Sequence, residues 1–463
     1  METHRYDLVV IGSGPAGQKA AIAAAKQKKR VAITDRRRSI GGASLHTGTI
    51  PSKTLREAIL YLSGFRQRSF YGRGYTVKDR ITVKDLAFRV QAVLKRELEV
   101  VRAQLKRNRV DVLEGTAHFS DPHTLEIDTK EGIVRAGADY VLIACGTRPE
   151  TNPHIRLDGL RVFDSDQLLS VADREIPRNA IVVGGGVIGL EYASMFAALN
   201  TEVTIIDGRQ RLLDFVDHEL VDALCFHMRR NDATFRLGEN VVSVETDDRD
   251  RVVARLESGK KVIGDGLLYT AGRRGNTDTL NLEAAELRSD DRGRIAVDDH
   301  YRTAVPHIYA AGDVIGFPSL ASAAMEQGRM AASHMFGITC ESAPKLMPYG
   351  IYTIPEISMV GETEQQLTAE KVCYEVGVAR FDELAKGQMI GDDSGLLKLL
   401  FDPETTELLG VHVIGEGASE LVHIGQAVLS THGSIKYFRD IVFNYPTLAE
   451  AYKVAALDGL NKL

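Results

Sequence analysis

Two glycine-rich turns are the residues of this 463-residue chain whose spacing points most directly to chemistry. The first turn is Gly12-Ser13-Gly14-Pro15-Ala16-Gly17, and the second is Gly184-Gly185-Gly186-Val187-Ile188-Gly189. Glycines at the first, third and sixth positions of such a turn permit a tight bend and let a pyrophosphate approach the backbone closely. Each turn therefore predicts a binding site for a dinucleotide.

The elements around the first turn have the order that such a site requires. The apolar run Tyr6–Ile11 predicts a buried parallel strand, and the alanine-rich run Gln18–Gln27 predicts the helix after the turn. The N-terminus of that helix would offer N–H groups and the positive end of its dipole to the phosphates. A second strand, Arg30–Thr34, ends at Asp35, whose carboxylate is placed to accept a hydrogen bond from a ribose hydroxyl.

The second turn repeats this order with the strand Ala180–Val183, the helix Glu191–Leu199 and the strand Glu202–Ile206, which ends at Asp207. Two complete patterns of strand, glycine turn, helix and strand imply two bound nucleotides, or one bound nucleotide and a second site that has lost its ligand. An enzyme with two dinucleotides commonly pairs a flavin with a nicotinamide, between which hydride passes directly. The sequence therefore predicts an oxidoreductase that moves hydride to or from a nicotinamide dinucleotide.

The residues after the second strand leave the choice of nicotinamide nucleotide open. Asp207 favours the free 2′-hydroxyl of NAD and would repel a 2′-phosphate. Arg209 and Arg211 follow at once, and guanidinium groups match phosphates bidentately. A site with one acid and two arginines accepts either nucleotide, unless both arginines are only solvated surface residues.

The remaining segments predict an α/β fold with two Rossmann-like dinucleotide-binding domains and a C-terminal α+β interface domain. We expect residues 1–150 and 275–345 to bind FAD, residues 151–274 to bind NAD(P), and residues 346–463 to form the interface. Elements expected outside the two fingerprints are the strands Tyr140–Ala144, Ile308–Ala311, Leu396–Phe401 and Leu408–Ile414 and the helices Asp85–Lys106, Ser419–Thr431 and Thr447–Leu457.

Further nucleotide-binding residues are expected near the ends of strands. Asp313, directly after Gly312, is placed to hold a sugar hydroxyl, although an ordinary turn aspartate is the alternative. Gly42, Gly146 and Gly272 are also expected at the nucleotide sites. The run Arg36-Arg37-Arg38 is either a contact for the adenosine side of FAD or a solvated face.

Composition excludes several function classes. A net charge of −6 argues against a nucleic-acid partner, which needs a concentrated basic face. The cysteines have neither disulfide-framework nor metal-ligand spacing, so we expect no metal site and a cytoplasmic location; they are Cys145, Cys225, Cys340 and Cys373. The most apolar stretch, Ala180–Leu199, contains Glu191 and a glycine turn, which favours a strand, turn and helix over a membrane span.

Along essentially its whole length the chain resembles the pyridine nucleotide-disulfide reductase family. The motifs that carry the resemblance are the first glycine turn, Gly41-Gly42 with Ile50-Pro51-Ser52-Lys53, Gly184 to Glu191, Ala311-Gly312-Asp313, and Tyr445-Pro446-Thr447 with Glu450. The resemblance implies that the first and fourth motifs hold one non-covalent FAD and that the third holds NAD or NADP. It also implies a homodimer formed through the C-terminal domain.

Two departures from the family's pattern concern the disulfide. Most members carry two cysteines, with four residues between them, where this chain has Ser44 and Thr49. Hydroxyl side chains form no disulfide. Most members also carry a histidine where this chain has Tyr445, and a phenol with a pKa of roughly 10 is a poor base at neutral pH. The dithiol and its acid–base partner are therefore missing together.

This pattern is similar to a transhydrogenase branch of the family, marked by residues 47–53, 325–329, 443–447 and 449–456. The implied reaction, of the Si-specific type, is NADPH + NAD⁺ ⇌ NADP⁺ + NADH through bound FAD, without a redox-active disulfide. Members of that branch usually keep the first cysteine, where this chain has Ser44. That departure leaves room for an NAD(P)H oxidase or quinone reductase, and a non-catalytic nucleotide sensor is the third hypothesis.

The resemblance also assigns roles near the flavin. Lys53, at the expected start of a helix, would lie near the flavin and pair with Glu191, and its fixed positive charge would stabilise the reduced ring. Solvent-exposed helix positions are the alternative for both residues. Val187 would cover the flavin until nucleotide enters, or would serve only helix packing. Tyr445 and Glu450 would reach across the dimer interface. His46 is a weak candidate for a redox-linked proton site, and an ordinary loop histidine is the alternative.

Overall fold

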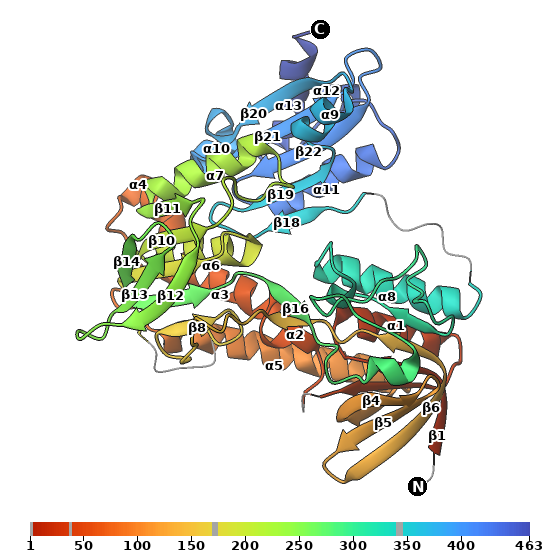
Figure 1. Cartoon of the computed structure of the whole chain (residues 1–463). Coiled ribbons are helices and arrows are strands. Elements are labelled where there is room, and N and C mark those ends of the chain that lie inside the picture. Colours follow the sequence, from red (N-terminus) through yellow and green to blue (C-terminus); the bar gives the residue numbers. More distant parts are fainter. Residues whose placement is uncertain (1–2, 37–38, 169–174, 339–345) are drawn as a thin grey trace. The chain divides into compact units, whose positions relative to one another are not determined.

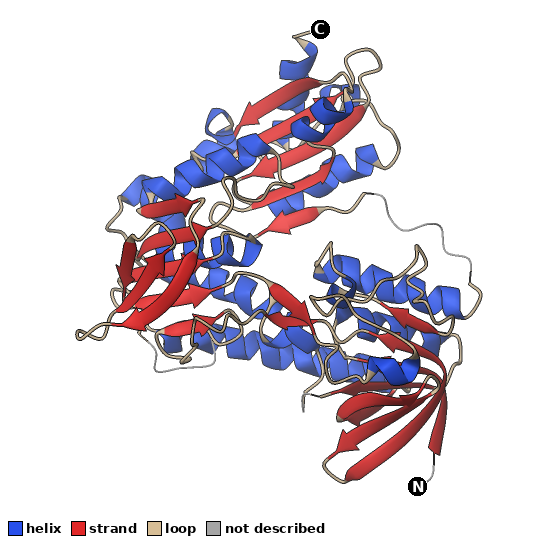
Figure 2. Cartoon of the chain, in the orientation of Figure 1, coloured by secondary structure: helices blue, strands red, loops and turns tan. Residues whose placement is uncertain are grey.

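The structure, a computed structural model, describes residues 3–36, 39–168, 175–338 and 346–463 (Figure 1). Arg37, Arg38 and Cys340 lie outside these described residues. The chain divides into two compact units, and each combines helices with sheets (Figure 2). The first unit comprises Met1–Leu55, Ala87–Glu150 and Gly272–Pro344, and the second comprises Arg56–Leu86, Thr151–Ala271 and Lys345–Leu463. The predicted α/β fold class is confirmed.

The first unit is built on a sheet whose described strands have the order β3-β2-β1-β6-β5-β4, with β17 paired to β6. The strands β1, β2, β3, β6 and β17 run parallel, whereas β4, β5 and β6 form an antiparallel meander. The bounds of these strands are β1 Thr3–Ile11, β2 Val31–Asp35, β3 Asp111–Glu114, β4 Thr116–Asp121, β5 Thr124–Thr129, β6 Gly132–Ile143 and β17 Ile308–Ala310.

Both faces of this sheet are buried, because successive side chains of a strand point to opposite faces. On one face Leu8 and Val10 pack against the helices α1 (Pro15–Lys26) and α8 (Ala321–Met335). On the other face Val9 and Ile11 pack against the meander and the segment around residues 280–297. The apolar run of β1 therefore reflects burial on both sides, as its sequence predicts.

The second unit contains a parallel sheet of strand order β11-β10-β9-β15-β8. The antiparallel strands β12, β13 and β14 cover one face of it. The bounds are β8 Val162–Asp164, β9 Asn179–Val183, β10 Glu202–Asp207, β11 Ala233–Leu237, β12 Val241–Thr246, β13 Val252–Leu256, β14 Lys261–Gly264 and β15 Gly266–Tyr269. The helices α6 (Val187–Ala198) and α7 (His218–Arg230) follow β9 and β10 along the chain.

The C-terminal part of the second unit is an antiparallel sheet of order β18-β19-β22-β21-β20. The alternate residues Leu397, Leu399 and Phe401 of β21 pack against three helices on one face. The elements are β18 Tyr349–Ile351, β19 Ile357–Gly361, β20 Glu375–Arg380, β21 Leu396–Phe401, β22 Leu408–Ile414, α9 Glu364–Glu370, α10 Ala385–Ile390, α11 Ala418–Leu429, α12 Lys436–Asp440 and α13 Glu450–Leu460.

The other described elements connect these sheets. They are α2 Gly42–His46, α3 Thr49–Leu62, α4 Arg68–Tyr71, α5 Val83–Arg107, the antiparallel pair β7 Thr147–Pro149 and β16 Arg273–Gly275, and the 3₁₀ turns Phe65–Gln67, Leu282–Ala285, Asp313–Ile315 and Phe381–Glu383. No helix among the described residues is long and apolar enough to cross a membrane.

Most predicted elements exist, and the errors lie at their ends. The strand predicted at Tyr140–Ala144 begins at Gly132, because its first half pairs with β5. Lys53 lies in the second turn of α3 rather than at its start, since Pro51 sits in the first turn, where a missing N–H breaks no helical bond. The helix predicted from Thr447 begins at Glu450.

Candidate functional site

The two glycine turns have the same local geometry. Each is followed by a helix whose N-cap is glycine, Gly14 or Gly186, with no side-chain cap, so the first N–H groups are open to an anion. A Cβ on Gly17 would lie 1.9 Å from the carbonyl oxygen of Gly12, and a Cβ on Gly189 would lie 1.9 Å from that of Gly184. Only glycine therefore allows the helix start to pack this closely on the turn.

In the first unit, Asp35 and Ser13 join the end of β2 to the glycine turn. The backbone N–H and the hydroxyl of Ser13 both donate to Oδ2 of Asp35, at 3.0 and 2.5 Å. The Ser13 hydroxyl accepts from the N–H of Gly41 at 2.9 Å. The adjacent Gly42 has a φ of 63°, and a Cβ there would lie 2.6 Å from the Cα of Gly14. The first two sequence motifs are therefore brought together in space.

A pocket opens beside this turn in the first unit. It encloses about 410 Å³, including solvent at its mouth, and lies at the carboxyl ends of β1 and β2. Arg36 donates to the amide oxygen of Asn276 at 3.1 Å, and the amide nitrogen of Asn276 donates to the carbonyl of Cys145 at 3.0 Å. The lining residues are Ile11, Gly12, Thr34, Asp35, Arg36, Gly115, Thr116, Ala117, Cys145, Asn276, Thr279 and Leu280.

Gly312 and Asp313 follow β17 at the same edge of the sheet. The N–H of Gly312 donates to the buried side chain of Gln327 at 2.8 Å, so α8 holds this turn. Asp313 lies 3.5 Å from the hydroxyl of Thr147, which also accepts from the guanidinium of Arg273 at 2.8 Å. Burial raises the pKa of the Asp313 carboxyl, and Arg273 opposes that rise only in part.

These residues fit an FAD. The turn at Gly12–Gly17 leaves room for a pyrophosphate, the pocket beside Asp35 opens where an adenosine would bind, and Asp313 is a half-buried acceptor suited to a sugar hydroxyl. Within the described residues, the hydroxyls of Ser39 and Thr47 are buried without hydrogen-bond partners. A polar ligand beside α2 would supply the donors and acceptors that these groups require.

Asp313→Asn is expected to weaken FAD binding about tenfold, because a charged hydrogen bond contributes about 1.5 kcal/mol. Since burial raises the pKa of Asp313, its ionised form at neutral pH destabilises the flavin-free protein, and the neutral amide is expected to raise the melting temperature of that form. Flavin fluorescence titration measures the loss of FAD affinity, and thermal unfolding of the deflavinated protein measures the rise in melting temperature. Unchanged FAD affinity would leave Asp313 as an ordinary turn aspartate.

In the second unit, Asp207 is already occupied by protein donors. Its Oδ2 accepts from the N–H of Gly185 at 2.6 Å, and the Arg209 guanidinium grips both carboxylate oxygens at 2.9 and 2.8 Å. Burial alone would raise the pKa of Asp207, but Arg209 and the N–H donors outweigh it and lower that pKa below its usual value. Arg209 remains 47% exposed, and Arg211 instead lies 3.8 Å from Asp222.

Glu191 is buried, with 3% of its surface exposed, so it is not an exposed helix acid. Its Oε1 accepts a hydrogen bond from the N–H of Tyr352 at 2.9 Å. Val187 is the first residue of α6 and is half-buried beside Gly186. Lys53, which the sequence predicts as the partner of Glu191, is half-buried and belongs to the first unit, so this pairing stays a prediction.

The positions of the family's two cysteines lie on separate helices. Ser44 is a half-buried residue of α2, and Thr49 is the first residue of α3. Among the described residues, Cys145, Cys225 and Cys373 are free thiols. Burial raises the pKa of Cys145 to about 12, which keeps that thiol protonated and unreactive.

The other predicted residues lie in turns, at the end of α2 or at the surface. Gly146 and Gly272 both have positive φ, and the carbonyl of Gly272 accepts from the N–H of Glu150 at 3.0 Å. The ring of His46 is tied to the carbonyl of Ile40 at 2.9 Å. Tyr445 is 73% exposed.

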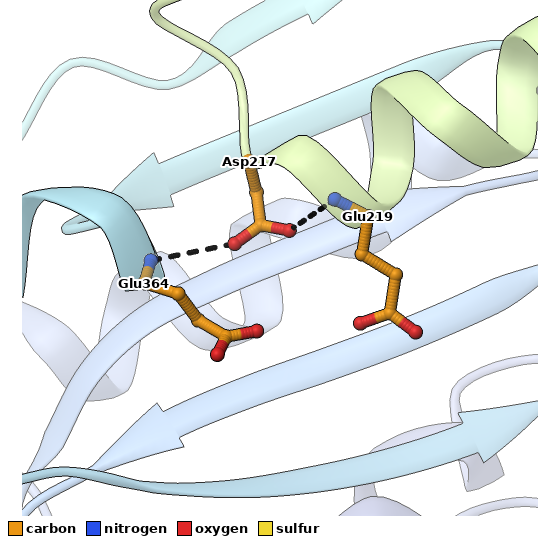
Figure 3. A group of neighbouring side chains, drawn as sticks. All are labelled: Asp217, Glu219 and Glu364. Carbon is orange, nitrogen blue, oxygen red and sulfur yellow. Dashed lines mark hydrogen bonds between the residues drawn. The ribbon is translucent and has the colours of Figure 1, made fainter. Parts of the chain in front are cut away.

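Three carboxylates of the second unit, on Asp217, Glu219 and Glu364, converge with the spacing of a metal site (Figure 3). They surround a cation that the chain itself supplies. The ammonium of Lys398, fully buried on β21, contacts Asp217 and Glu219 at 3.0 Å each and also contacts Glu364. A divalent ion would meet this ammonium, so the cluster is an ion-pair network around a buried lysine.

Sequence patterns missed several residues of these sites. Gly115–Ala117 and Asn276 line the first pocket, and Gln327 holds Gly312. Tyr352 fixes Glu191 through a backbone N–H, which leaves no signature in a side chain. Gln327 falls within residues 325–329, which mark the transhydrogenase branch, but that mark assigns no role to its side chain.

Two family profiles match the chain. The profile described as pyridine nucleotide-disulphide oxidoreductase matches residues 6–328. The profile of the dimerisation domain of the same oxidoreductases matches residues 347–456. The first match includes both glycine turns, and the second includes the C-terminal antiparallel sheet.

Relatives match along nearly the whole chain. A Mycobacterium bovis protein named soluble pyridine nucleotide transhydrogenase is 54% identical over 460 residues, covering 99% of this chain and 98% of that protein. A protein of the same name from Klebsiella pneumoniae is 46% identical over 465 residues, with coverages of 99% and 98%. The Cu(II) complex of the HOCl-induced flavoprotein disulfide reductase RclA from Escherichia coli has a TM-score of 0.88 at 25% identity, covering 99% of each chain.

Proposed function

Because the chain belongs to the pyridine nucleotide-disulphide oxidoreductase family, we propose that it catalyses NADPH + NAD⁺ ⇌ NADP⁺ + NADH as a flavoprotein. It is an oxidoreductase, and its relatives at 46% and 54% identity carry the name of this reaction. The observation that carries the proposal is the pair of matching glycine turns, one in each unit, each followed by a helix without a side-chain cap. One turn serves the flavin and the other serves the nicotinamide nucleotides.

We assign FAD to the domain of residues 1–150 and 275–345, and NAD(P) to residues 151–274. Bound FAD supplies the site that accepts hydride from one nicotinamide and returns it to another. Gly12–Gly17 and Gly42 bind its pyrophosphate, Asp35 and the adjoining pocket bind its adenosine, and Asp313 binds its sugar chain. The open glycine turn, the pocket beside it and the half-buried Asp313 carboxylate support these assignments.

Lys53 and Glu191 form the proposed charged pair beside the flavin. Lys53 supplies a fixed positive charge that stabilises negative charge on the reduced ring, and Glu191 holds the ammonium in place. The burial of Glu191 supports this role, because a carboxylate taken out of water is stabilised by charged and hydrogen-bonding partners. Ser44 and Thr49 form no disulfide, so hydride passes between stacked rings without a sulfur relay.

Asp207 and Arg209 allow the nicotinamide site to bind both NADH and NADPH. For NADH, the ribose 2′-hydroxyl shares the Asp207 carboxylate. For NADPH, the 2′-phosphate draws the Arg209 guanidinium away from Asp207, and the guanidinium exchanges one bidentate anion for another. The half-exposed position of Arg209 supports this exchange, because the side chain can leave Asp207 without disturbing the core.

Arg209→Ala is therefore expected to lower kcat/KM for NADPH by about 10- to 100-fold, the loss of a charged bidentate contact worth about 1.5–3 kcal/mol. The value for NADH is expected to change less, because Asp207 keeps its bond from Gly185. Steady-state kinetics with each nucleotide measure both changes. Arg211→Ala is the matched control, since it removes the same charge from a residue that contacts Asp222. Equal losses of kcat/KM for the two nucleotides would contradict the proposal that Arg209 binds the 2′-phosphate of NADPH.

The C-terminal domain, residues 346–463, is the proposed dimer interface. Tyr437, Val442 and Tyr445 are exposed although they are apolar or aromatic, as expected for a surface that a second copy covers. Tyr445 and Glu450 shape the partner's nicotinamide pocket and do not act as an acid–base pair. We place the enzyme in the cytoplasm, where both nicotinamide couples are available.

One experiment tests the function. The purified flavoprotein is mixed with NADPH and a spectrally distinct NAD⁺ analogue in the absence of oxygen, and reduction of the analogue is followed. Turnover is the expected result. Turnover only when oxygen or a quinone is added would identify an oxidase or quinone reductase instead. A flavin that NADPH never bleaches would identify a nucleotide sensor.

A further inference from the structure

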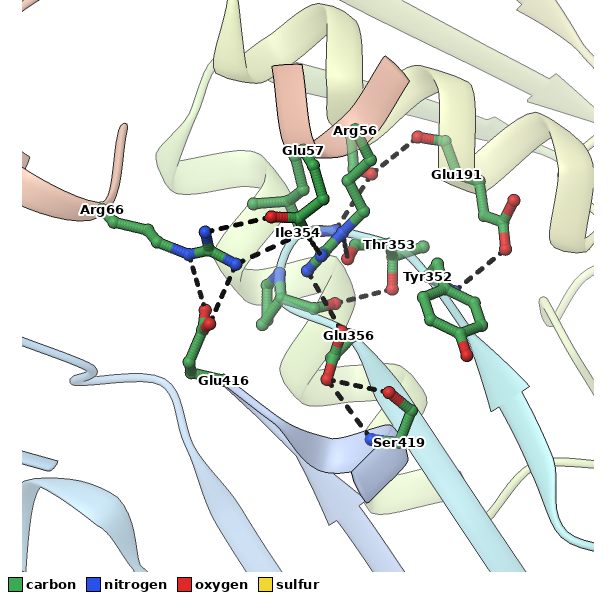
Figure 4. A network of polar contacts seen from close by, with 12 residues as sticks. Arg56, Glu57, Arg66, Glu191, Tyr352, Thr353, Ile354, Glu356, Glu416 and Ser419 are labelled. Carbon is green, nitrogen blue, oxygen red and sulfur yellow. Dashed lines mark hydrogen bonds and ion pairs between the residues drawn. The ribbon is translucent and has the colours of Figure 1, made fainter. Parts of the chain in front are cut away.

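A buried ion pair in the second unit belongs to neither glycine turn (Figure 4). Arg56, on α3, is 4% exposed, and Glu356, just before β19, is 6% exposed. Their side chains lie 3.3 Å apart. Removing two charges from water is costly unless good geometry and further hydrogen bonds compensate for the lost hydration. The other hydrogen bonds of these two side chains therefore indicate what the pair holds in place.

The segment between Tyr352 and Glu356 is attached to α6 on one side. The N–H of Tyr352 donates to the Glu191 carboxylate at 2.9 Å, and the N–H of Ile354 donates to the Ser194 hydroxyl at 3.0 Å. That hydroxyl donates in turn to the backbone carbonyl of Glu191 at 2.8 Å. One N–H group of this segment therefore bonds the Glu191 carboxylate directly, and a second is linked to the Glu191 backbone through Ser194.

Arg56 holds the same segment through two other groups. Its Nε donates to the carbonyl of Thr353 at 3.1 Å, and its Nη2 lies 3.3 Å from a carboxylate oxygen of Glu356. Glu356 also accepts from the N–H and hydroxyl of Ser419 at 3.3 Å each. One guanidinium thus ties both the middle and the end of the segment.

We propose that Arg56 is a positioning residue of the hydride-transfer site, holding residues 352–356 so that the Tyr352 N–H fixes the Glu191 carboxylate. Arg56 follows Lys53 by three residues on α3, so one helix carries both the proposed partner of Glu191 and the residue that sets its orientation. The inference rests on the proposed function, because it assigns Glu191 to the flavin site.

The test is a double-mutant cycle between Arg56→Lys and Glu191→Gln, read in the first half-reaction alone. Arg56→Lys keeps the charge for Glu356 but removes the planar fork that reaches Thr353 as well. Flavin bleaching by NADPH is followed by stopped flow in the FAD-loaded enzyme. We expect the limiting rate to fall about tenfold, because small displacements of a charged group weaken catalysis steeply. The dissociation constant for NADPH, from the same traces, is expected to stay within about twofold of wild type, since the nucleotide turn is untouched.

In the Glu191→Gln background, the same Arg56→Lys change is expected to have almost no further effect, because residues that act through each other are not additive. A role in stability alone would give equal losses in both backgrounds, and that result would overturn the proposal. So would a wild-type bleaching rate in Arg56→Lys. Arg66→Lys is the matched control: Arg66 shares Glu57 with Arg56 but touches neither Thr353 nor Glu356, so it separates the loss of the Glu57 contact from the loss of the segment.

If Arg56→Lys does not fold or does not load flavin, Ser194→Ala enters the cycle instead, because it removes the acceptor of the Ile354 N–H on the same segment. Additivity of Ser194→Ala with Glu191→Gln then overturns the proposal. Failure of the proposed function is distinguishable. A wild-type enzyme whose flavin is bleached by NADPH but not reoxidised by the NAD⁺ analogue is no transhydrogenase. The double-mutant cycle can still be measured in that case, because it uses only the bleaching step.

Discussion

Lys53→Met is expected to slow flavin bleaching by NADPH about a hundredfold, because removal of one preorganised electrostatic group from an active site costs roughly 10²–10³ in rate. Methionine keeps the length and the apolar stem of lysine on α3 but has no charge to offset the negative charge that develops on the flavin. Binding of NADPH is expected to remain near wild type, since the second glycine turn and Arg209 are intact. Stopped-flow absorbance at several NADPH concentrations separates the limiting rate from binding.

Lys53→Arg is the control for charge. It is expected to recover much of the rate, because a cation remains beside Glu191, although its planar shape differs from that of an ammonium. A methionine variant that bleaches within about twofold of wild type, or that loses only NADPH affinity, would show that Lys53 is a solvated helix residue and not part of the site.

Lys398→Met is expected to lower the free energy of unfolding by about 3–5 kcal/mol, the usual result of removing one partner of a buried ion pair. The fully buried ammonium neutralises Asp217, which is itself only 1% exposed, and Glu364 and Glu219 lean on it from α9 and α7. Urea denaturation of the FAD-loaded protein at neutral pH measures the change. Lys462→Met, which breaks a half-exposed pair with Asp458, is the control and is expected to cost at most about 1 kcal/mol.

The pH dependence of this loss has a definite sign. In the native protein burial opposes ionisation of Asp217, but His412 and Lys398 outweigh it and lower the pKa of that carboxyl below 3.8, so its contribution to stability is present above about pH 4 and is lost at lower pH. Lys398 has a pKa raised to about 12, so its contribution is complete below 10.5 and is lost as the pH rises through 12.

Without Lys398, the burial of Asp217 is opposed only by His412 and by backbone N–H donors, so the pKa of Asp217 is expected to be higher than in the native protein. The stability of the variant relative to the native protein therefore falls as the pH rises through the titration of Asp217. The deficit of Lys398→Met is therefore expected to be largest at neutral pH and to shrink below about pH 4. A deficit independent of pH would mean that packing around the methylene stem, and not charge, explains the loss.

The glycine turns and their strands were predictable because their signal is local. A strand, a glycine turn and a helix lie within about 25 residues, and the acid that ends the next strand follows at a fixed distance. The alternatives left open at Asp207 and Arg209 depend on side-chain geometry. The structure finds the two residues paired, whereas the sequence only places them two positions apart.

The interactions that hold the sites come from distant parts of the chain and leave little trace in any pattern. Tyr352 is 161 residues from Glu191, and Arg56 is 297 residues from Thr353. Backbone N–H and carbonyl groups make these contacts, so the type of side chain at 352 or 353 carries no information about them. Lys398 was also missed, because a lysine flanked by leucines in β21 resembles the outward-facing residue of an edge strand.

Asp217 is the last residue before α7 and serves that helix as well as Lys398. The same Oδ1 accepts the N–H of Glu219 at 3.1 Å and the ammonium of β21 at 3.0 Å. Pulling the C-terminal sheet away from α7 would therefore unwind the first turn of that helix in the same event. A single carboxylate oxygen thus links the helix beside the nucleotide-binding sheet to the C-terminal sheet, and we expect these two parts of the second unit to unfold together.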